Sequence, residues 1–428
     1  MKFKNIFLLA ILLMAGSALY AQVKISAELR PRTEYNHGVK SPAMDDQDAS
    51  IITSQRTRLN LDYKNESFAF GVVMQDVRKW GDEKQLTTNA EKDLYLHQAW
   101  AEWFMSDKFS LKAGRQQLVY DDHRILGSVG WAQQARSHDL ALFKYAGEVN
   151  VHLGIAYNNE NLNNNIYTGP NVYKRMQFLW LNHKGDNYTA SVLFLSNGKA
   201  QNLEFGANNS VTKQDVICSR TLGTHIKTEL AGIKLAGNLY YQFGEEVIKA
   251  NPGTPDGKID LSAYNFSLDA TMSLNENVNV GAGYELLSGT DQTGADKNNS
   301  FAPLYGTNHK FNGFMDYFYV GNPHGNVGLH DIYLKANAKP GKVKFNAALH
   351  FFSADGDIVD QSKGLGTELD FWCGYSHKGQ VQLDFGYSHM FASDALYAIK
   401  GVPENNETNN WAWVQLTFKP TLFESKKD

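Results

Sequence analysis

From residue 22 onward, segments of alternating polarity are joined in turn by a very short connection and a long one. In the first segment, one parity holds Val23, Ile25, Ala27, Leu29, Pro31, Thr33 and Tyr35. The other parity holds Lys24, Ser26, Glu28, Arg30, Arg32 and Glu34. Successive side chains of a strand point to opposite faces, so one face is apolar and the other is charged. Repetition of this pattern with alternating loop lengths is typical of a transmembrane β-barrel with lipid outside and water inside.

The pattern predicts an all-β fold, an antiparallel barrel of about eighteen strands with short periplasmic turns and long extracellular loops. The expected strands are 23–35, 54–64, 67–78, 93–105, 109–118, 138–145, 148–158, 174–184, 187–196, 216–230, 231–244, 259–273, 277–288, 327–339, 342–353, 366–377, 380–391 and 410–420. Most have the 9–11 residues or so that a tilted membrane strand needs. An even number of strands places both ends of the chain on the periplasmic side.

The two ends of the chain carry their own signals. Residues 1–21 are typical of a secretory signal peptide, with a basic start, an apolar run and a small residue, Ala21, before the expected cut. Cleavage after Ala18 is the alternative. Residues 22–420 are expected to form a single barrel domain, followed by a polar C-terminal tail over 421–428.

The bulk composition excludes other classes. The 41 basic and 45 acidic residues give a net charge of −4, and loss of Lys2 and Lys4 with the signal peptide makes it −6. This acidic net charge does not indicate a protein that binds nucleic acid. The mature chain has no apolar stretch long enough for a membrane-spanning helix. Cys218 and Cys373 fall on strands that are not neighbours, so no disulfide is expected.

Four arginines on the first two predicted strands share the inward parity: Arg30, Arg32, Arg56 and Arg58. They repel one another unless carboxylates or a passing anion intervene, and nearby acids can supply part of that compensation: Glu28, Glu34 and Asp62. One interpretation is the ladder of paired charges that lines any water-filled barrel. The other is an anion-attracting stripe, because rings of Arg or Lys favour anions in pores.

The segment from Gly114 to Asp139 is denser in polar residues than any other connection. Strict alternation would turn Arg115 toward lipid, where a charge is costly, so the sequence predicts a bulge at Gly114 or a position at the rim. The adjacent His138 and Asp139 do not make a catalytic triad with Ser137, because neighbours in sequence point in different directions. No metal site, cofactor or catalytic residue is expected.

The same segment and a later block carry a family resemblance. Gly114-Arg115-Gln116, Arg124, Trp131, Gln134, Arg136 and Asp139 resemble the signature of the alginate-export family of outer-membrane barrels, as do Ser288-Gly289-Thr290-Asp291, Phe301–Phe311, Gly313–Asp316, Gly328-Leu329 and Asp331. The resemblance implies an eighteen-stranded barrel in which an anionic polymer such as a polyuronate passes an electropositive pore. It also implies four pore or constriction residues: Arg115, Arg124, Arg136 and Asp139.

These observations predict a monomeric channel of the bacterial outer membrane, not an enzyme, for passive transport of an anionic oligo- or polysaccharide. The expected surroundings are outer-membrane lipid, lipopolysaccharide and a possible periplasmic partner. The alternatives are a general or differently selective porin, a phospholipase-like barrel and an adhesive barrel. The longest loop, 289–326, is expected to fold into or over the lumen, because water would otherwise expose its apolar residues. We expect a solvated loop around Asp45, Asp46 and Asp48.

Overall fold

The computed structural model describes residues 22–86, 94–162, 165–170, 172–318 and 326–425, which form a closed antiparallel β-barrel. Eighteen strand positions surround the lumen, and β1 closes the ring by pairing with β18, with Thr33 opposite Val414. The strands are β1 (Gln22–His37), β2 (Ser50–Lys64), β3 (Phe68–Lys79), β4 (Tyr95–Phe104), β5 (Phe109–Gln116), β6 (His138–Tyr145), β7 (Val149–Tyr157), β8 (Arg175–Lys184), β9 (Tyr188–Phe205), β10 (Val211–Leu230), β11 (Ile233–Ile248), β12 (Gly257–Ser273), β13 (Val278–Leu287), β14 (Leu329–Ala338), β15 (Val343–Ser353), β16 (Gly364–His377), β17 (Val381–Ala392) and β18 (Asn409–Phe418).

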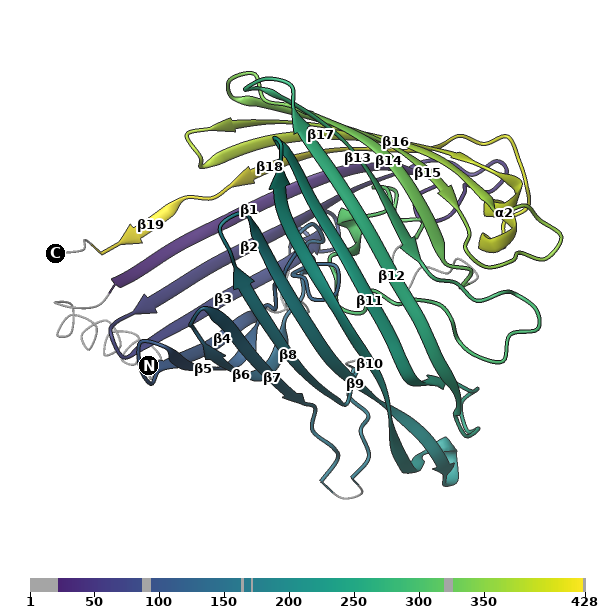
Figure 1. Ribbon diagram of the computed structural model, residues 1–428, viewed down its shortest axis with the longest axis horizontal. Coiled ribbons are helices and arrows are strands. Elements are labelled where there is room, and N and C mark those ends of the chain that lie inside the picture. Colours follow the sequence, from purple (N-terminus) through teal and green to yellow (C-terminus); the bar gives the residue numbers. More distant parts are fainter. Residues whose placement is uncertain (1–21, 87–93, 163–164, 171, 319–325, 426–428) are drawn as a thin grey trace.

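The eighteen predicted strands are confirmed, and their short connections all lie at one end of the barrel. The start of β1 also lies at this end (Figure 1). At the opposite end, β9 to β12 continue beyond their predicted limits, to lengths of 16 to 20 residues. The sequence underestimated these strands because polar residues on both parities above the membrane hide the alternation there.

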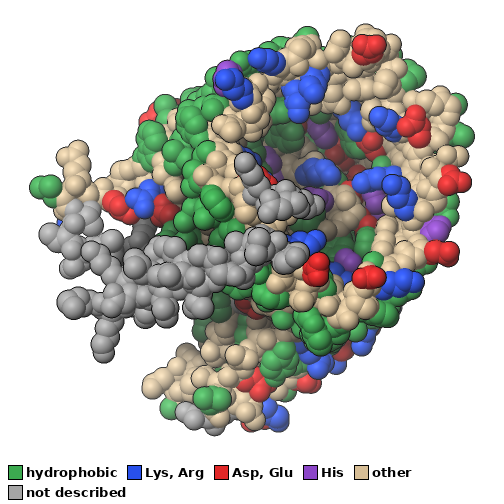
Figure 2. Space-filling model, turned by 90° about the vertical axis from the view of Figure 1, so that its left-hand side faces the viewer, with side chains coloured by type: hydrophobic (Ala, Val, Ile, Leu, Met, Phe, Trp, Pro, Cys, Tyr) green, Lys and Arg blue, Asp and Glu red, His purple; other side chains and the backbone are tan. Residues whose placement is uncertain are grey.

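The outer face of the wall is apolar, as the alternation predicts. Side chains exposed on this face include Leu59, Leu153, Ile155, Leu239, Tyr241, Phe351 and Val414. Aromatic pairs stand beside the short turns, where Tyr63 stacks on Phe68 with ring centroids 5.3 Å apart. Figure 2 looks into the end with the short turns, and basic, acidic and imidazole side chains gather inside the opening. The polar inward parity therefore lines a hollow that faces the periplasm.

Four small elements are additional to the predicted strands in the described residues, and two of them are the 3₁₀ helices η1 (Ala207–Asn209) and η2 (Asn308–Lys310). β19 (Thr421–Glu424) continues the position of β18 along β1, so part of the expected polar tail is a strand. The helix α2 (Asp394–Lys400) lies in the loop between β17 and β18. The expected signal peptide, residues 1–21, and residues 426–428 lie outside the described residues. Both cysteines are free, as predicted. None of the helices in the described segments is long and apolar enough to cross a membrane.

Candidate functional site

The inner wall carries the four predicted arginines, called here the arginine cluster: Arg30 and Arg32 on β1, and Arg56 and Arg58 on β2. The strand register sets Arg30 directly opposite Arg56, and Glu28 opposite Arg58. Like charges that face each other across two strands destabilise the pair unless other groups intervene. The cluster therefore depends on what surrounds the guanidinium groups.

Carboxylates compensate only part of this charge. Glu28 Oε1 lies 2.5 Å from Arg56 Nη2, and Glu34 Oε1 lies 3.3 Å from Arg32 Nε. The third predicted acid, Asp62, lies opposite Lys24 in the register, and in the described part of the chain it forms no ion pair with the cluster. Among those same residues, no carboxylate oxygen lies within 4.0 Å of a guanidinium nitrogen of Arg30 or Arg58. These two arginines keep a positive charge without a direct acidic partner.

The loop between β5 and β6, residues 117–137, enters the lumen and covers the cluster; we call it the first plug loop. Its backbone carbonyls accept hydrogen bonds from the guanidinium groups. Arg30 Nη1 donates to Gly130 O at 2.9 Å and Arg30 Nη2 to Trp131 O at 2.9 Å. Arg32 Nη1 donates to the same Trp131 O at 2.9 Å, and its guanidinium carbon lies 4.0 Å from the Trp131 ring centroid. As a result Arg30, Arg32 and Arg56 are buried rather than lining an open bore.

The loop between β13 and β14, residues 288–328, is called the second plug loop. Its described residues, 288–318 and 326–328, also fold inward, which confirms the prediction for that part of 289–326. It reaches three separate parts of the wall. The Tyr305 hydroxyl donates to Asn197 of β9 at 2.5 Å, Ala302 N donates to Gln242 of β11 at 2.9 Å, and Met315 N donates to Glu368 of β16 at 2.8 Å. Residues 319–325, which include the apolar Tyr319, lie outside the described residues.

Arg124 joins the two plug loops to the wall. It is only 1% exposed, and its Nη2 donates to Glu285 of β13 at 2.8 Å and to Asn312 at 2.9 Å. Its guanidinium carbon also lies 4.5 Å from the Phe311 ring centroid. The resemblance implied a pore residue, but the structure places Arg124 inside the plug, where no passing solute reaches it.

Arg136 lies at the other end of the first plug loop and is half-buried. Its Nη1 donates to Gly306 O of the second plug loop at 3.1 Å. The main chains of the two loops also meet directly, because Leu126 and Tyr305 form a parallel β-bridge. Arg136 thus helps to hold the loops together as one body, the plug.

Replacement of Arg124 by methionine should loosen the plug. The variant leaves the Glu285 carboxylate buried without its cation, a change that typically costs about 3–5 kcal/mol. Hydrogen exchange of amides 301–318 is expected to become faster in the variant. Arg115→Met, which alters an exposed ion pair on the outer face, is the matched control and should leave those amides unchanged. Equal protection in both variants would show that the Arg124 pair does not anchor the plug.

Arg115 and Asp139 do not line the pore, which corrects two predicted pore positions. They face each other across β5 and β6 on the outward parity, and Arg115 Nη1 lies 2.8 Å from Asp139 Oδ2. Pairing of β5 with β4 and with β6 continues without a shift through Gly114, so of the two expected alternatives, a bulge at Gly114 or a position at the rim, the structure shows the second. The outward charge is tolerated because the pair stands at the end of both strands, where a charge costs little, and because each group has its counter-ion.

An acidic region of the inner wall, called here the acidic wall, was not predicted. It consists of inward carboxylates on β13, β14 and β16 and one histidine on β15: Glu285, Asp331, His350, Glu368 and Asp370. These carboxylates accept hydrogen bonds from the second plug loop, including Phe314 N to Asp370 at 3.2 Å. Acids repeated at the inward parity near the ends of successive strands were the signal that could have revealed them.

The plug therefore lies between two walls of opposite character. The guanidinium groups of the arginine cluster donate hydrogen bonds to carbonyl oxygens of the plug, and the carboxylates of the acidic wall accept hydrogen bonds from its N–H groups. Gly313 permits the close approach on the acidic side, since its φ is +84° and an added Cβ would lie 2.6 Å from the Glu368 carboxylate. Backbone polarity is thus matched to wall charge on each side.

Two cavities of about 560 Å³ each border the plug. The one on the side of the long loops is lined in part by Arg32, Lys40, Arg78 and Trp131. The one on the periplasmic side is lined in part by Lys227, Lys310, Phe311, Tyr333, Lys335 and Trp372. Phe314 lines both cavities and therefore stands between them.

Phe314 ends a short aromatic stack. Its ring lies 5.5 Å from the His309 ring, which lies parallel to Trp131 with centroids 4.7 Å apart. The Nδ1 atom of His309 is 2.9 Å from Asp316 Oδ1, which fixes the imidazole in this position. The stack presents ring faces beside charged groups, a combination suited to sugars, whose rings have an apolar face and polar edges.

The helix α2 packs on the plug from the side of the long loops. Its residue Lys400 donates from Nζ to Tyr317 O and lies 5.8 Å from the ring centroid of the same residue. Burial lowers the pKa of Lys400 from its ordinary value of 10.5 to about 7. The ammonium group therefore loses its proton near neutral pH while the protein is folded.

This depressed pKa predicts a pH-dependent stability. Between about pH 7 and 10.5 the unfolded chain holds a proton on Lys400 that the folded chain has released, so stability rises with pH through this window. The thermal unfolding midpoint in detergent should rise from pH 7 to pH 9, and this rise should shrink in Lys400→Met. The exposed Lys297→Met is the control. An identical pH response in both variants would contradict the assignment.

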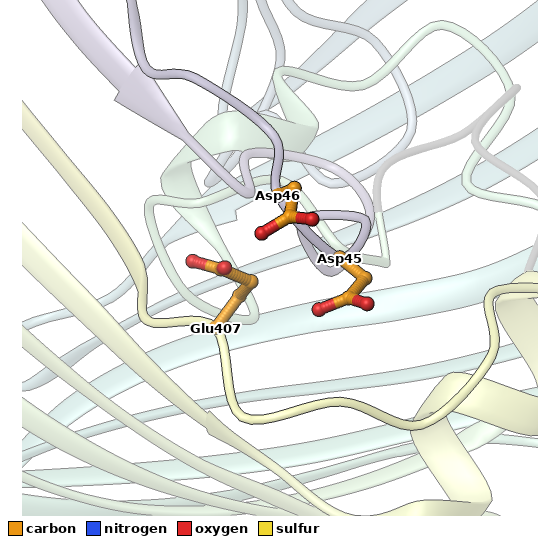
Figure 3. Close-up of side chains that lie close together, drawn as sticks. All are labelled: Asp45, Asp46 and Glu407. Atoms are coloured by element: carbon orange, nitrogen blue, oxygen red, sulfur yellow. The ribbon is translucent and has the colours of Figure 1, made fainter.

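Figure 3 shows the carboxylates of Asp45, Asp46 and Glu407 close to one another; Asp45 and Asp46 are exposed and Glu407 is half-buried. One oxygen from each lies within 4.8 Å of the others. Glu407 is also 3.7 Å from His37, and Asp48 is not part of the group. Asp45, Asp46 and Asp48 are all exposed, as expected for this loop.

A closed barrel with an apolar outer band, a polar lumen and inward-folded loops is the architecture of an outer-membrane channel of the porin class. The family model described as alginate export matches residues 21–410, and the chain belongs to this family. Its location is the bacterial outer membrane. No curated protein matches the chain in sequence.

Solved structures support the same fold at low sequence identity. The chain is similar to OccAB4 of Acinetobacter baumannii (TM-score 0.60, 11% identity, 93% of this chain and 98% of that one). It is also similar to a BenF-like porin from Pseudomonas fluorescens Pf-5 (0.59, 11%, 94% and 99%). A third is OccK2 (OpdF) of Pseudomonas aeruginosa, solved in complex with glucuronate (0.57, 12%, 94% and 98%).

Proposed function

We propose that this channel passively transports an anionic oligo- or polysaccharide whose sugars carry carboxylates, such as a polyuronate. The observation that carries the proposal is the pair Arg30 and Arg58, two inward guanidinium groups for which the described residues provide no carboxylate partner. Fixed cations at the constriction of a pore replace part of the hydration of a passing anion. The acidic net charge does not decide the matter, since distant surface charges are screened over roughly 8 Å at physiological salt.

Other features support the same class of solute. Lys227, Lys310 and Lys335 line the periplasmic cavity together with aromatic rings, so carboxylates and sugar faces would both find partners there. The similar OccK2 is described as a complex with glucuronate, a sugar carboxylate. The protein is further proposed to act as a monomer within lipid and lipopolysaccharide, with delivery of the polymer by a periplasmic partner.

The competing proposal is a general or differently selective porin on the same scaffold. The two can be separated by current measurements on the mature chain in a planar bilayer. A tetramer of guluronate or mannuronate should block the current at concentrations about tenfold lower than maltotetraose, because only the uronates form charge-assisted hydrogen bonds with arginine. This difference should shrink at 1 M salt, where the screening length falls to about 3 Å. Equal block by both sugars would favour the general porin.

A further inference from the structure

The segment Gly130–Gln133 of the first plug loop turns consecutive carbonyl oxygens toward the arginine cluster. Gly130 O, Trp131 O and Ala132 O lie 2.9, 2.9 and 3.2 Å from Arg30 nitrogens, and the Gln133 side-chain Oε1 lies 3.1 Å from Arg30 Nε. Arg56 Nη1 approaches the carbonyls of Gly130, Ala132 and Gln133 at 3.3 to 3.4 Å. The segment therefore presents a row of partial negative charges where an anion would lie.

These acceptors are neutral amides facing full positive charges. Hydrogen bonds in which one partner is ionised are strong, and those in which both partners are ionised, as between arginine and carboxylate, add bidentate geometry. At Arg58 the cluster can still donate a further hydrogen bond. Its Nε donates to Gln75 Oε1 at 2.5 Å, while its buried Nη2 has no hydrogen-bond partner in the described residues. A carboxylate is thus a better partner for Arg30 and Arg58 than the groups that occupy their surroundings.

Strained residues flank the segment. Val129 has φ +51° and Ala135 has φ +54°. Side chains with a Cβ rarely adopt this left-handed region, and a β-branched valine is a clear outlier there. Both residues are held by few bonds: Val129 N donates to Thr307 Oγ1 at 3.0 Å, and Ala135 N donates to Ala132 O at 3.2 Å. Release of the segment would relieve strain at both ends.

We propose that Gly130–Gln133 is an internal stand-in for the carboxylates of the transported polymer, bound at the arginine cluster and displaced when a polyuronate arrives. This inference rests on the proposed function and adds its regulation. The uronate carboxylates replace the carbonyls of Gly130 to Ala132 on Arg30 and reach Nη2 of Arg58. The rest of the plug stays in place, anchored through Arg124 and the acidic wall. Opening is therefore coupled to the arrival of the correct charge.

A reversible cross-link tests the proposal. The Gln133 Nε2 atom lies 3.0 Å from Ser54 Oγ on β2, so cysteines at these two positions can be joined by a short bifunctional methanethiosulfonate and released by dithiothreitol. Cys218 and Cys373 are replaced by serine in all samples. Linking should weaken block by the guluronate tetramer about tenfold, and reduction should restore it. The single variant Gln133→Cys, labelled with a monofunctional reagent, is the control for bulk.

The outcomes separate the two proposals. Equal block by the uronate before and after reduction overturns the displacement while the anionic-substrate proposal stands. Failure of the unlinked channel to distinguish the uronate from maltotetraose overturns the proposed function itself. Hydrogen exchange on the unmodified protein provides an independent readout. The amides of Val129 and Ala135 should exchange faster with guluronate tetramer present, whereas slower exchange would show that the ligand binds against a closed segment and would overturn the displacement.

Discussion

Replacement of Arg30 and Arg58 by glutamine is expected to move the reversal potential of the channel from anion preference toward cation preference. The two side chains keep hydrogen-bonding capacity but lose charges that no carboxylate in the described segments balances. At roughly 10 Å and an effective dielectric constant of about 30, each charge contributes about 1 kcal/mol to the energy of a passing ion. Loss of both should lower the chloride-to-potassium permeability ratio by at least about tenfold at low salt.

The control for this change is Arg115→Gln, which removes the same charge from the outer face of the barrel. It should leave the reversal potential unchanged, since the side chain does not border the lumen. A parent channel that already prefers potassium would show instead that the arginines serve the wall and the plug alone. The proposal of an anionic substrate would then fail.

Deletion of residues 295–322 should raise single-channel conductance several-fold. These residues supply much of the buried apolar side of the plug, including Tyr305, Met315 and Tyr317. The wall should survive, because the loop leaves and rejoins it at one place, where Thr290 N donates to Asn326 O at 2.9 Å. A conductance trace in symmetrical salt measures the effect.

The control is a loop deletion at a site away from the lumen. Residues 207–209 form the exposed tip between β9 and β10, and their removal should not change conductance. If the two deletions behave alike, the second plug loop does not limit the current, and the narrowest level must lie elsewhere in the barrel.

The sequence predicted the strands of the barrel wall far better than the loops that fill the lumen. Alternation is a local property, so it located all eighteen strands and turned the arginine cluster inward. The destination of the first plug loop depends on hydrogen bonds such as that from Arg30 to Gly130, which are separated by 100 residues. The alternation along one strand contains no information about such a distant partner. Arginines that line an open pore and arginines that bind a plug loop therefore show the same sequence pattern.

Three pore placements that came from the resemblance failed, for two physical reasons. Arg115 and Asp139 lie at the rim on the outer face, where the cost of a charge falls toward the membrane boundary and each side chain compensates the other. Arg124 was assigned to the pore by resemblance, although its burial comes from three elements brought together only in the folded barrel: the two plug loops and Glu285 of β13. A single sequence shows such a residue as a charge in a loop.

The strand β1 binds the plug and also closes the barrel. β1 carries Arg30 and Arg32, and it pairs on its other edge with β18 and β19. A ring with the first plug loop outside the lumen would enclose guanidinium groups stripped of their carbonyl partners. Correct placement of the loop and completion of the cylinder therefore stabilise each other, because both depend on β1.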